Sequence, residues 1–119
     1  DETLFIGAMN QAAEAVGEKY LKGWIKRQDE KQIKTRAIRV KSGEVEDIIY
    51  NSSIGYLRNV RLAPEDFTSP SHIIIYGDNV ATITTGRENF GVVITSRDYA
   101  ITLKNCFNQV WKNSKDYIN

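Results

Sequence analysis

His72, the only histidine of the chain, begins the stretch of sequence with the clearest potential for chemistry. It precedes a run of isoleucines, a Gly-Asp-Asn turn signal and a second run of β-forming residues, which together predict a strand hairpin over residues 72–84. A histidine in such a hairpin can attack a phosphate ester if a nearby cation holds the phosphate. The alternatives are an imidazole that lines a ligand pocket and a structural residue at the end of a strand.

The spacing around His72 argues against phosphodiester hydrolysis. Phosphodiesterases of the phospholipase D type need a lysine two residues after the histidine and an aspartate five residues further on. Those positions hold Ile74 and Asn79. A shifted alignment of the hairpins puts Pro70 in place of the nucleophile. Since neither alignment supplies a nucleophile together with a cation, we expect that this chain is not an enzyme.

Cys106 and the acidic residues offer no better catalytic site. Cys106 follows the apolar periodicity of the last predicted helix, so we interpret it as a core residue. One cysteine cannot form an internal disulfide, and a reducing, cytoplasmic location is therefore expected. With one histidine and one cysteine, a metal site would depend mainly on carboxylates, and Glu65-Asp66 lies in a turn-like, solvated segment. We expect no metal and no cofactor.

A basic cluster formed by Lys34, Arg36, Arg39 and Lys41 has two interpretations: a solvated edge strand, or a contact with DNA or another phosphate. The chain as a whole carries 16 Lys and Arg against 15 Asp and Glu, a formal charge of +1. This balance argues against an overall electrostatic attraction to nucleic acid or to an anionic membrane. No segment approaches the roughly 18 apolar residues of a membrane span, and no membrane partner is expected.

The hydrophobic pattern predicts a single α/β (α+β) domain over residues 1–119, with a mixed β-sheet flanked by helices. The predicted strands are Thr3–Ala8, Ile33–Val40, Leu57–Ala63, His72–Tyr76, Val80–Thr84 and Gly91–Thr95. The predicted helices are one that starts at Asn10 and ends within residues 26–32, a short one over Glu44–Asn51, and one capped by Ser96.

Two segments carry a resemblance to a known family: SPSHIIIYGDNVA, and the closing segment VITSRDYA followed by F and VWK. Over Glu2–Lys115 the chain resembles the domain that follows the winged helix in TrmB-type transcriptional regulators. The resemblance implies a fold similar to one half of the phospholipase D architecture, with the catalytic histidine–lysine pair lost. It also implies that DNA is bound only through a winged helix, which residues 1–119 lack. Because the sequence begins at Asp1 and becomes apolar within two residues, we interpret it as a fragment of a longer protein.

The predicted function is non-catalytic effector sensing, dimerisation, or both, in a TrmB-like regulator. The alternatives are a degenerate phospholipase-D-type phosphodiesterase and a stand-alone nucleic-acid-binding module. Ligands of open α/β sheets bind at the carboxyl ends of the strands, and here we expect a site for a small polar or sugar effector at that place. The alternative is that the cleft inherited from the phospholipase D architecture is filled by side chains. The expected ligand-binding residues are Asn10, Ser69, His72, Thr85 and Glu88. A homodimer is also expected, with Trp24 and Trp111 as its spare apolar surface.

Overall fold

The computed structural model describes residues 2–7, 19, 23, 26–27, 30–40, 58–69, 71–84, 88 and 90–116. Within these ranges, seven strands form one mixed sheet in the order β6-β5-β4-β1-β2-β3-β7, and the helix α4 crosses it. The strands are β1 (Glu2–Gly7), β2 (Lys34–Arg39), β3 (Arg58–Leu62), β4 (Ser71–Tyr76), β5 (Asn79–Thr84), β6 (Phe90–Thr95) and β7 (Lys115–Asp116), and α4 spans Arg97–Lys112. The predicted α+β class with a mixed sheet is confirmed.

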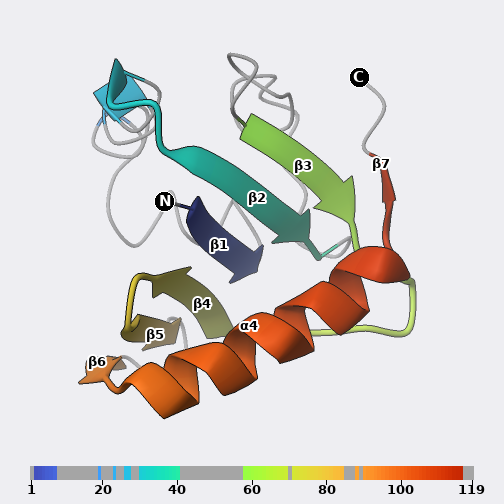
Figure 1. Ribbon diagram of the computed structural model, residues 1–119. Coiled ribbons are helices and arrows are strands. Elements are labelled where there is room, and N and C mark those ends of the chain that lie inside the picture. The colour runs from blue at the N-terminus through green and yellow to red at the C-terminus, as the bar shows by residue number, and fades with distance from the viewer. Residues whose placement is uncertain are drawn as a thin grey trace.

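The central strand β1 has a parallel neighbour on one side and an antiparallel neighbour on the other. It pairs with β2 in parallel and with β4 in the opposite direction (Figure 1). Its residues are almost entirely buried, which explains why TLFIG reads as a continuous apolar run without alternation. β2 also pairs in parallel with β3, whereas β4, β5 and β6 form an antiparallel meander.

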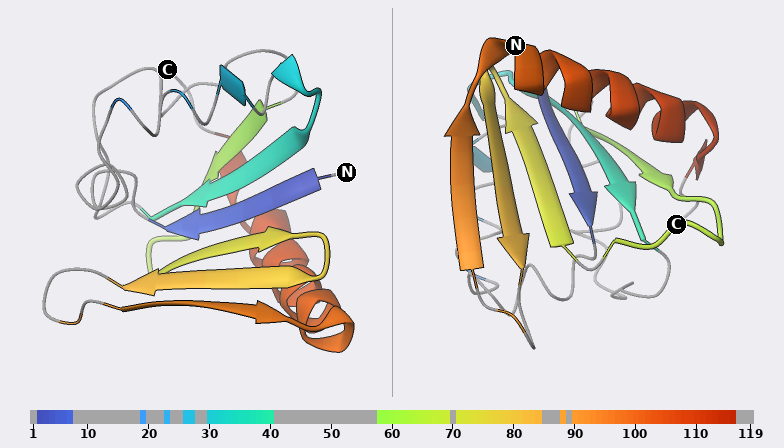
Figure 2. Two further views of the ribbon diagram at one scale, coloured as in Figure 1. Left: turned by 90° about the vertical axis from the view of Figure 1, so that its left-hand side faces the viewer. Right: turned by 90° about the horizontal axis from the view of Figure 1, so that it is seen from below.

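Helix α4 covers one face of the sheet and runs obliquely across the strands (Figure 2). It begins as predicted, because Ser96 adopts an extended backbone and its Oγ accepts a hydrogen bond from the Tyr99 backbone N–H at 3.2 Å. The buried stripe of α4 consists of Ala100, Phe107 and Trp111. This stripe packs on buried side chains of the strands and the β3–β4 connection, namely Leu4, Ile6, Ile38, Ala63, Ile75 and Val80.

The β4–β5 hairpin is tighter than the sequence suggested. Tyr76 pairs with Asn79, so the loop contains just Gly77 and Asp78, and Asn79 belongs to the strand. Gly77 has a φ of +58°, and no positive φ is found at Asp78. A positive φ at the first loop residue alone is the pattern of a type II′ turn, which needs glycine at that position.

Three of the predictions are wrong. Cys106 is exposed, because it lies about 100° around the helix from the buried Phe107. Trp111 is buried at 8% exposure, so it offers no spare surface for a partner. The basic strand β2 is not an edge strand, since β1 and β3 flank it on both sides.

Other predicted elements are described in part or lie outside the described residues. Lys19, Gly23, Lys26, Arg27 and Glu30 are helical, in agreement with a helix that ends within residues 26–32. The chain then turns at Gln32, which has a φ of +57°. The predicted helix Glu44–Asn51 and the side chain of Trp24 lie outside the described residues.

Candidate ligand site at the carboxyl end of the central strand

The carboxyl end of β1 lies beside two polar residues from its neighbouring strands. Gly7, the last residue of β1, pairs with Arg39 of β2. On the other side, Ile6 pairs with Ile73 of β4, which places His72 next to Gly7. Since paired residues point to the same face of a sheet, His72, Gly7 and Arg39 form one row, on the face opposite α4.

The His72 ring packs directly against the backbone of Gly7. A Cβ atom added at Gly7 would collide with His72 Nδ1, and it would lie 3.2 Å from Cγ and 3.3 Å from the His72 Cα. The imidazole is also stacked with the Phe5 ring, with centroids 6.1 Å apart and an interplanar angle of 15°. Glycine at position 7 is therefore the residue that lets the imidazole approach the strand.

His72 is buried at 2% exposure, and burial lowers its pKa below the ordinary value of 6.5 because the charged form is poorly solvated there. Neither ring nitrogen has a hydrogen-bond partner among the residues that the structure describes. A neutral imidazole offers one N–H donor and one acceptor nitrogen. A ligand with a hydroxyl or amide group would satisfy both, and would remove the free-energy cost of leaving them unpaired.

The sequence singled out Arg39 as a member of the basic cluster, and not as one of the expected ligand-binding residues. Its side chain is fully buried, at 0% exposure. A guanidinium keeps its charge even when it is buried, so Arg39 adds a fixed positive charge to this end of the sheet. Alternation places Arg39 on the same face as Thr35 and Ala37, but that this face is buried is seen only in the structure.

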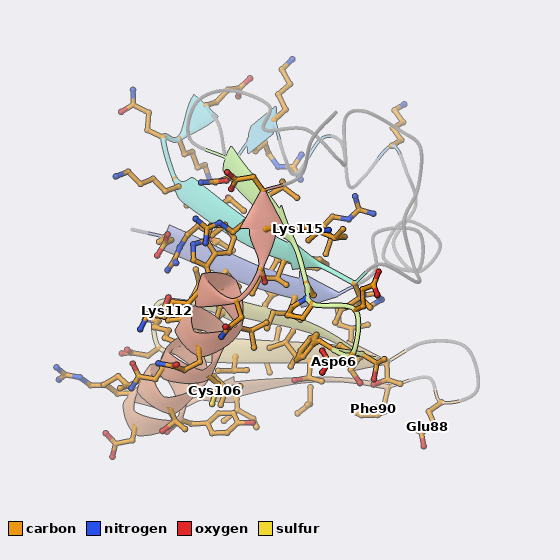
Figure 3. All side chains as sticks on the ribbon, turned by 90° about the vertical axis from the view of Figure 1, so that its right-hand side faces the viewer. Asp66, Glu88, Phe90, Cys106, Lys112 and Lys115 are labelled. Carbon is orange, nitrogen blue, oxygen red and sulfur yellow. The ribbon has the colours of Figure 1, made fainter. Side chains whose placement is uncertain are left out.

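The structure describes three of the five predicted site residues, namely Ser69, His72 and Glu88, and shows no contact between them. Ser69 is half-buried just before β4, and its hydroxyl donates to the Ser71 carbonyl oxygen at 2.7 Å. The Ser71 and Thr84 hydroxyls, 2.8 Å apart, join the start of β4 to the end of β5. Glu88 is exposed and lies before the first residue of β6, where its side chain points away from the sheet (Figure 3). Asn10 and Thr85 lie outside the described residues, and ligand binding at all five positions stays a prediction.

The β4–β5 hairpin has no cation at the position where the sequence comparison expected one. Ile74, which lies two residues after His72 on the same face of β4, is apolar and cannot bind phosphate. Within the described ranges, no three histidine, cysteine, aspartate or glutamate side chains are grouped so that they could hold a metal ion. None of the described helices is long and apolar enough to cross a membrane.

The fold is similar to one half of the phospholipase D architecture, a mixed sheet with a helix packed on it. No family model matches the sequence, and no curated protein matches it. Among the solved structures that share the fold are TrmBL2 and NucT. TrmBL2, an archaeal chromatin protein with a novel mode of DNA binding, has a TM-score of 0.70 and 14% identity over 97% of this chain. NucT from Helicobacter pylori has a TM-score of 0.60 and 12% identity over 98% of this chain and 82% of its own. The match covers 45% of the TrmBL2 chain.

Proposed function

We propose that this chain is the effector-sensing and/or dimerisation domain of a TrmB-like transcriptional regulator, and that it is not catalytic. The observation that carries the proposal is the fold shared with TrmBL2 over 97% of the chain. TrmBL2 is a DNA-binding protein more than twice as long as the matched region. In this proposal DNA is bound through a separate winged helix, in the cytoplasm, and the present domain transmits the effector signal.

The geometry of the hairpin supports a non-catalytic role. A histidine nucleophile has to reach the phosphorus atom of its substrate, yet His72 is 2% exposed and wedged against Gly7 and Phe5. The position that would hold the phosphate-binding lysine is Ile74. The expected result is no turnover of bis-p-nitrophenyl phosphate. Turnover that disappears in His72→Ala would overturn this part of the proposal and support the phosphodiesterase alternative.

Sensing is supported by the row at the end of β1. A buried neutral imidazole without a described partner, next to a glycine and a buried arginine, matches a small ligand that carries hydroxyl groups. Arg36 and Arg39 also weaken the stand-alone nucleic-acid alternative. Arg36 is paired with Glu2 and Arg39 is fully buried, so neither guanidinium is displayed on the surface for a phosphate backbone.

The test uses the full-length regulator that contains this domain, and measures DNA affinity with and without small carbohydrates. Asn10→Ala and His72→Ala are expected to reduce effector-dependent DNA release, whereas Lys112→Ala, a control at an exposed position on α4 outside the predicted site, is expected to leave it unchanged. An unchanged effector response in both site variants would remove this site from consideration. Tight, salt-dependent duplex binding by residues 1–119 alone would favour the nucleic-acid-binding alternative.

A further inference from the structure

The sheet ends in two very different edges within the described residues. The β7 edge is two residues long and consists of Lys115 and Asp116. The β6 edge is six residues long, reads FGVVIT, and is exposed along its whole length. Its apolar side chains are exposed on both faces, with Phe90 at 52% and Val93 at 57%.

The β6 edge has none of the usual protection against further strand pairing. An edge strand presents unpaired N–H and C=O groups, and proteins commonly shield it with charges, proline, a bulge or a short length. β6 contains no charged residue and no proline, and it pairs with β5 without interruption from Phe90 to Thr95. It also carries Val92 and Ile94, which are 44% and 41% exposed. Such a strand is suited to pairing with another strand.

We propose that β6 pairs antiparallel with β6 of a second copy of this chain, with Val92 opposite Val92. A two-fold axis normal to the sheet runs through this pair, so the seven strands of each copy continue into one sheet and both α4 helices lie on the same face. The inference rests on the dimerisation part of the proposed function, and it assigns that role to one surface.

The strand is self-complementary in this register. On the α4 face, Phe90 lies opposite Ile94 and Val92 opposite itself, so that six apolar side chains meet across the axis. On the other face, Gly91 lies opposite Val93, which gives the valine room. A shift of one residue would place α4-facing side chains opposite side chains of the other face, which the two-fold axis forbids.

The charges around the strand are compatible with the same register. The strand itself is neutral, so no like charges meet in the centre. Arg97 and Asp98, which begin α4 directly after the strand and its cap, carry opposite charges, so no net charge opposes pairing at that end of the strand.

Cysteine cross-linking tests the register. In a Cys106→Ser background, Val92→Cys is expected to form an intermolecular disulfide on mild oxidation, because directly opposed residues lie about 4.5–5.5 Å apart. The matched control is Ile94→Cys in the same background, which has similar exposure. Ile94 lies opposite Phe90, so the two introduced cysteines would be roughly 14 Å apart and should not cross-link. Equal cross-linking of both variants, or of neither, would overturn the inference.

Sedimentation separates this inference from the broader proposal. The wild-type chain is expected to be a dimer at high micromolar concentration. Val92→Lys is expected to be a folded monomer with an unchanged circular dichroism spectrum. The control Ile101→Lys, at an exposed apolar site on α4, is expected to remain a dimer. A dimer that survives Val92→Lys would refute the β6 pairing and leave dimerisation standing. A monomeric wild-type chain would refute both. Open-ended oligomers in place of a dimer would also contradict the closed two-fold pairing.

Discussion

The two faces of the sheet bury their polar side chains in different ways. On the α4 face, Arg36 donates to Glu2 at 2.6 and 3.0 Å and lies 5.1 Å from the Phe107 ring and 5.2 Å from the Trp111 ring. On the opposite face, the two ring nitrogens of His72 have no hydrogen-bond partner among the described residues. On the first face the Arg36 guanidinium is held by a carboxylate and two aromatic rings, and on the second the His72 imidazole keeps hydrogen-bonding capacity that a ligand could use. Burial alone therefore does not distinguish a core from a binding site.

The largest effect is expected from damage to the α4 face. Phe107→Ala should lower the free energy of unfolding by about 3–5 kcal/mol, because the ring is fully buried and its removal leaves a cavity. Urea denaturation followed by circular dichroism measures this. Asn105→Ala, at an exposed position of the same helix, should change stability by less than about 0.5 kcal/mol. A similarly small loss in Phe107→Ala would show that α4 does not complete the core.

A smaller effect is expected at the opposite face from Gly7→Ala. The new methyl group collides with the His72 ring, and overpacking of this kind costs about 1–3 kcal/mol. Because the collision depends on the imidazole, the cost should shrink when His72→Ala is present, and a double-mutant cycle measures the coupling. Additive losses would mean that Gly7 is required for its own backbone geometry, a φ of +156°, and not for contact with His72.

The smallest effect concerns pH. The pKa of His72 is lowered by burial in the folded state, so the unfolded chain binds more protons and the stability from this group is lost as the pH falls through about 6.5. The slope from one such group is at most about 1.4 kcal/mol per pH unit. His72→Gln, which does not titrate, should show a shallower loss of stability between pH 7.5 and 5. If both proteins lose stability in parallel, His72 is accessible to protons without unfolding.

The sequence predicted the elements better than it predicted their surroundings. All six predicted strands are present, and most of their ends differ from the prediction by one residue. The strands could be predicted because alternation and turn residues are local signals. β7 was missed because two residues are too few to show a period. The burial of Arg39 depends on β1 and β3 lying on either side of β2, a long-range pairing that no local pattern contains. Cys106 was misplaced because it borders the buried stripe of α4, where a small rotation of the helix decides exposure.

The central position of β1 sets a time order for folding. β1 lies near the start of this chain, yet its two neighbours in the sheet are residues 34–39 and 71–76. During synthesis, β1 therefore emerges before the other strands of the sheet. It cannot pair with both β2 and β4 until residue 76 has been made, and the α4 side chains that cover it are made later still. Contacts between such distant residues slow folding, because the entropy cost of closing the intervening loop comes before the favourable energy of the contacts. We therefore expect this sheet to form late and cooperatively, because its most completely buried strand is the one that pairs across the longest stretch of sequence.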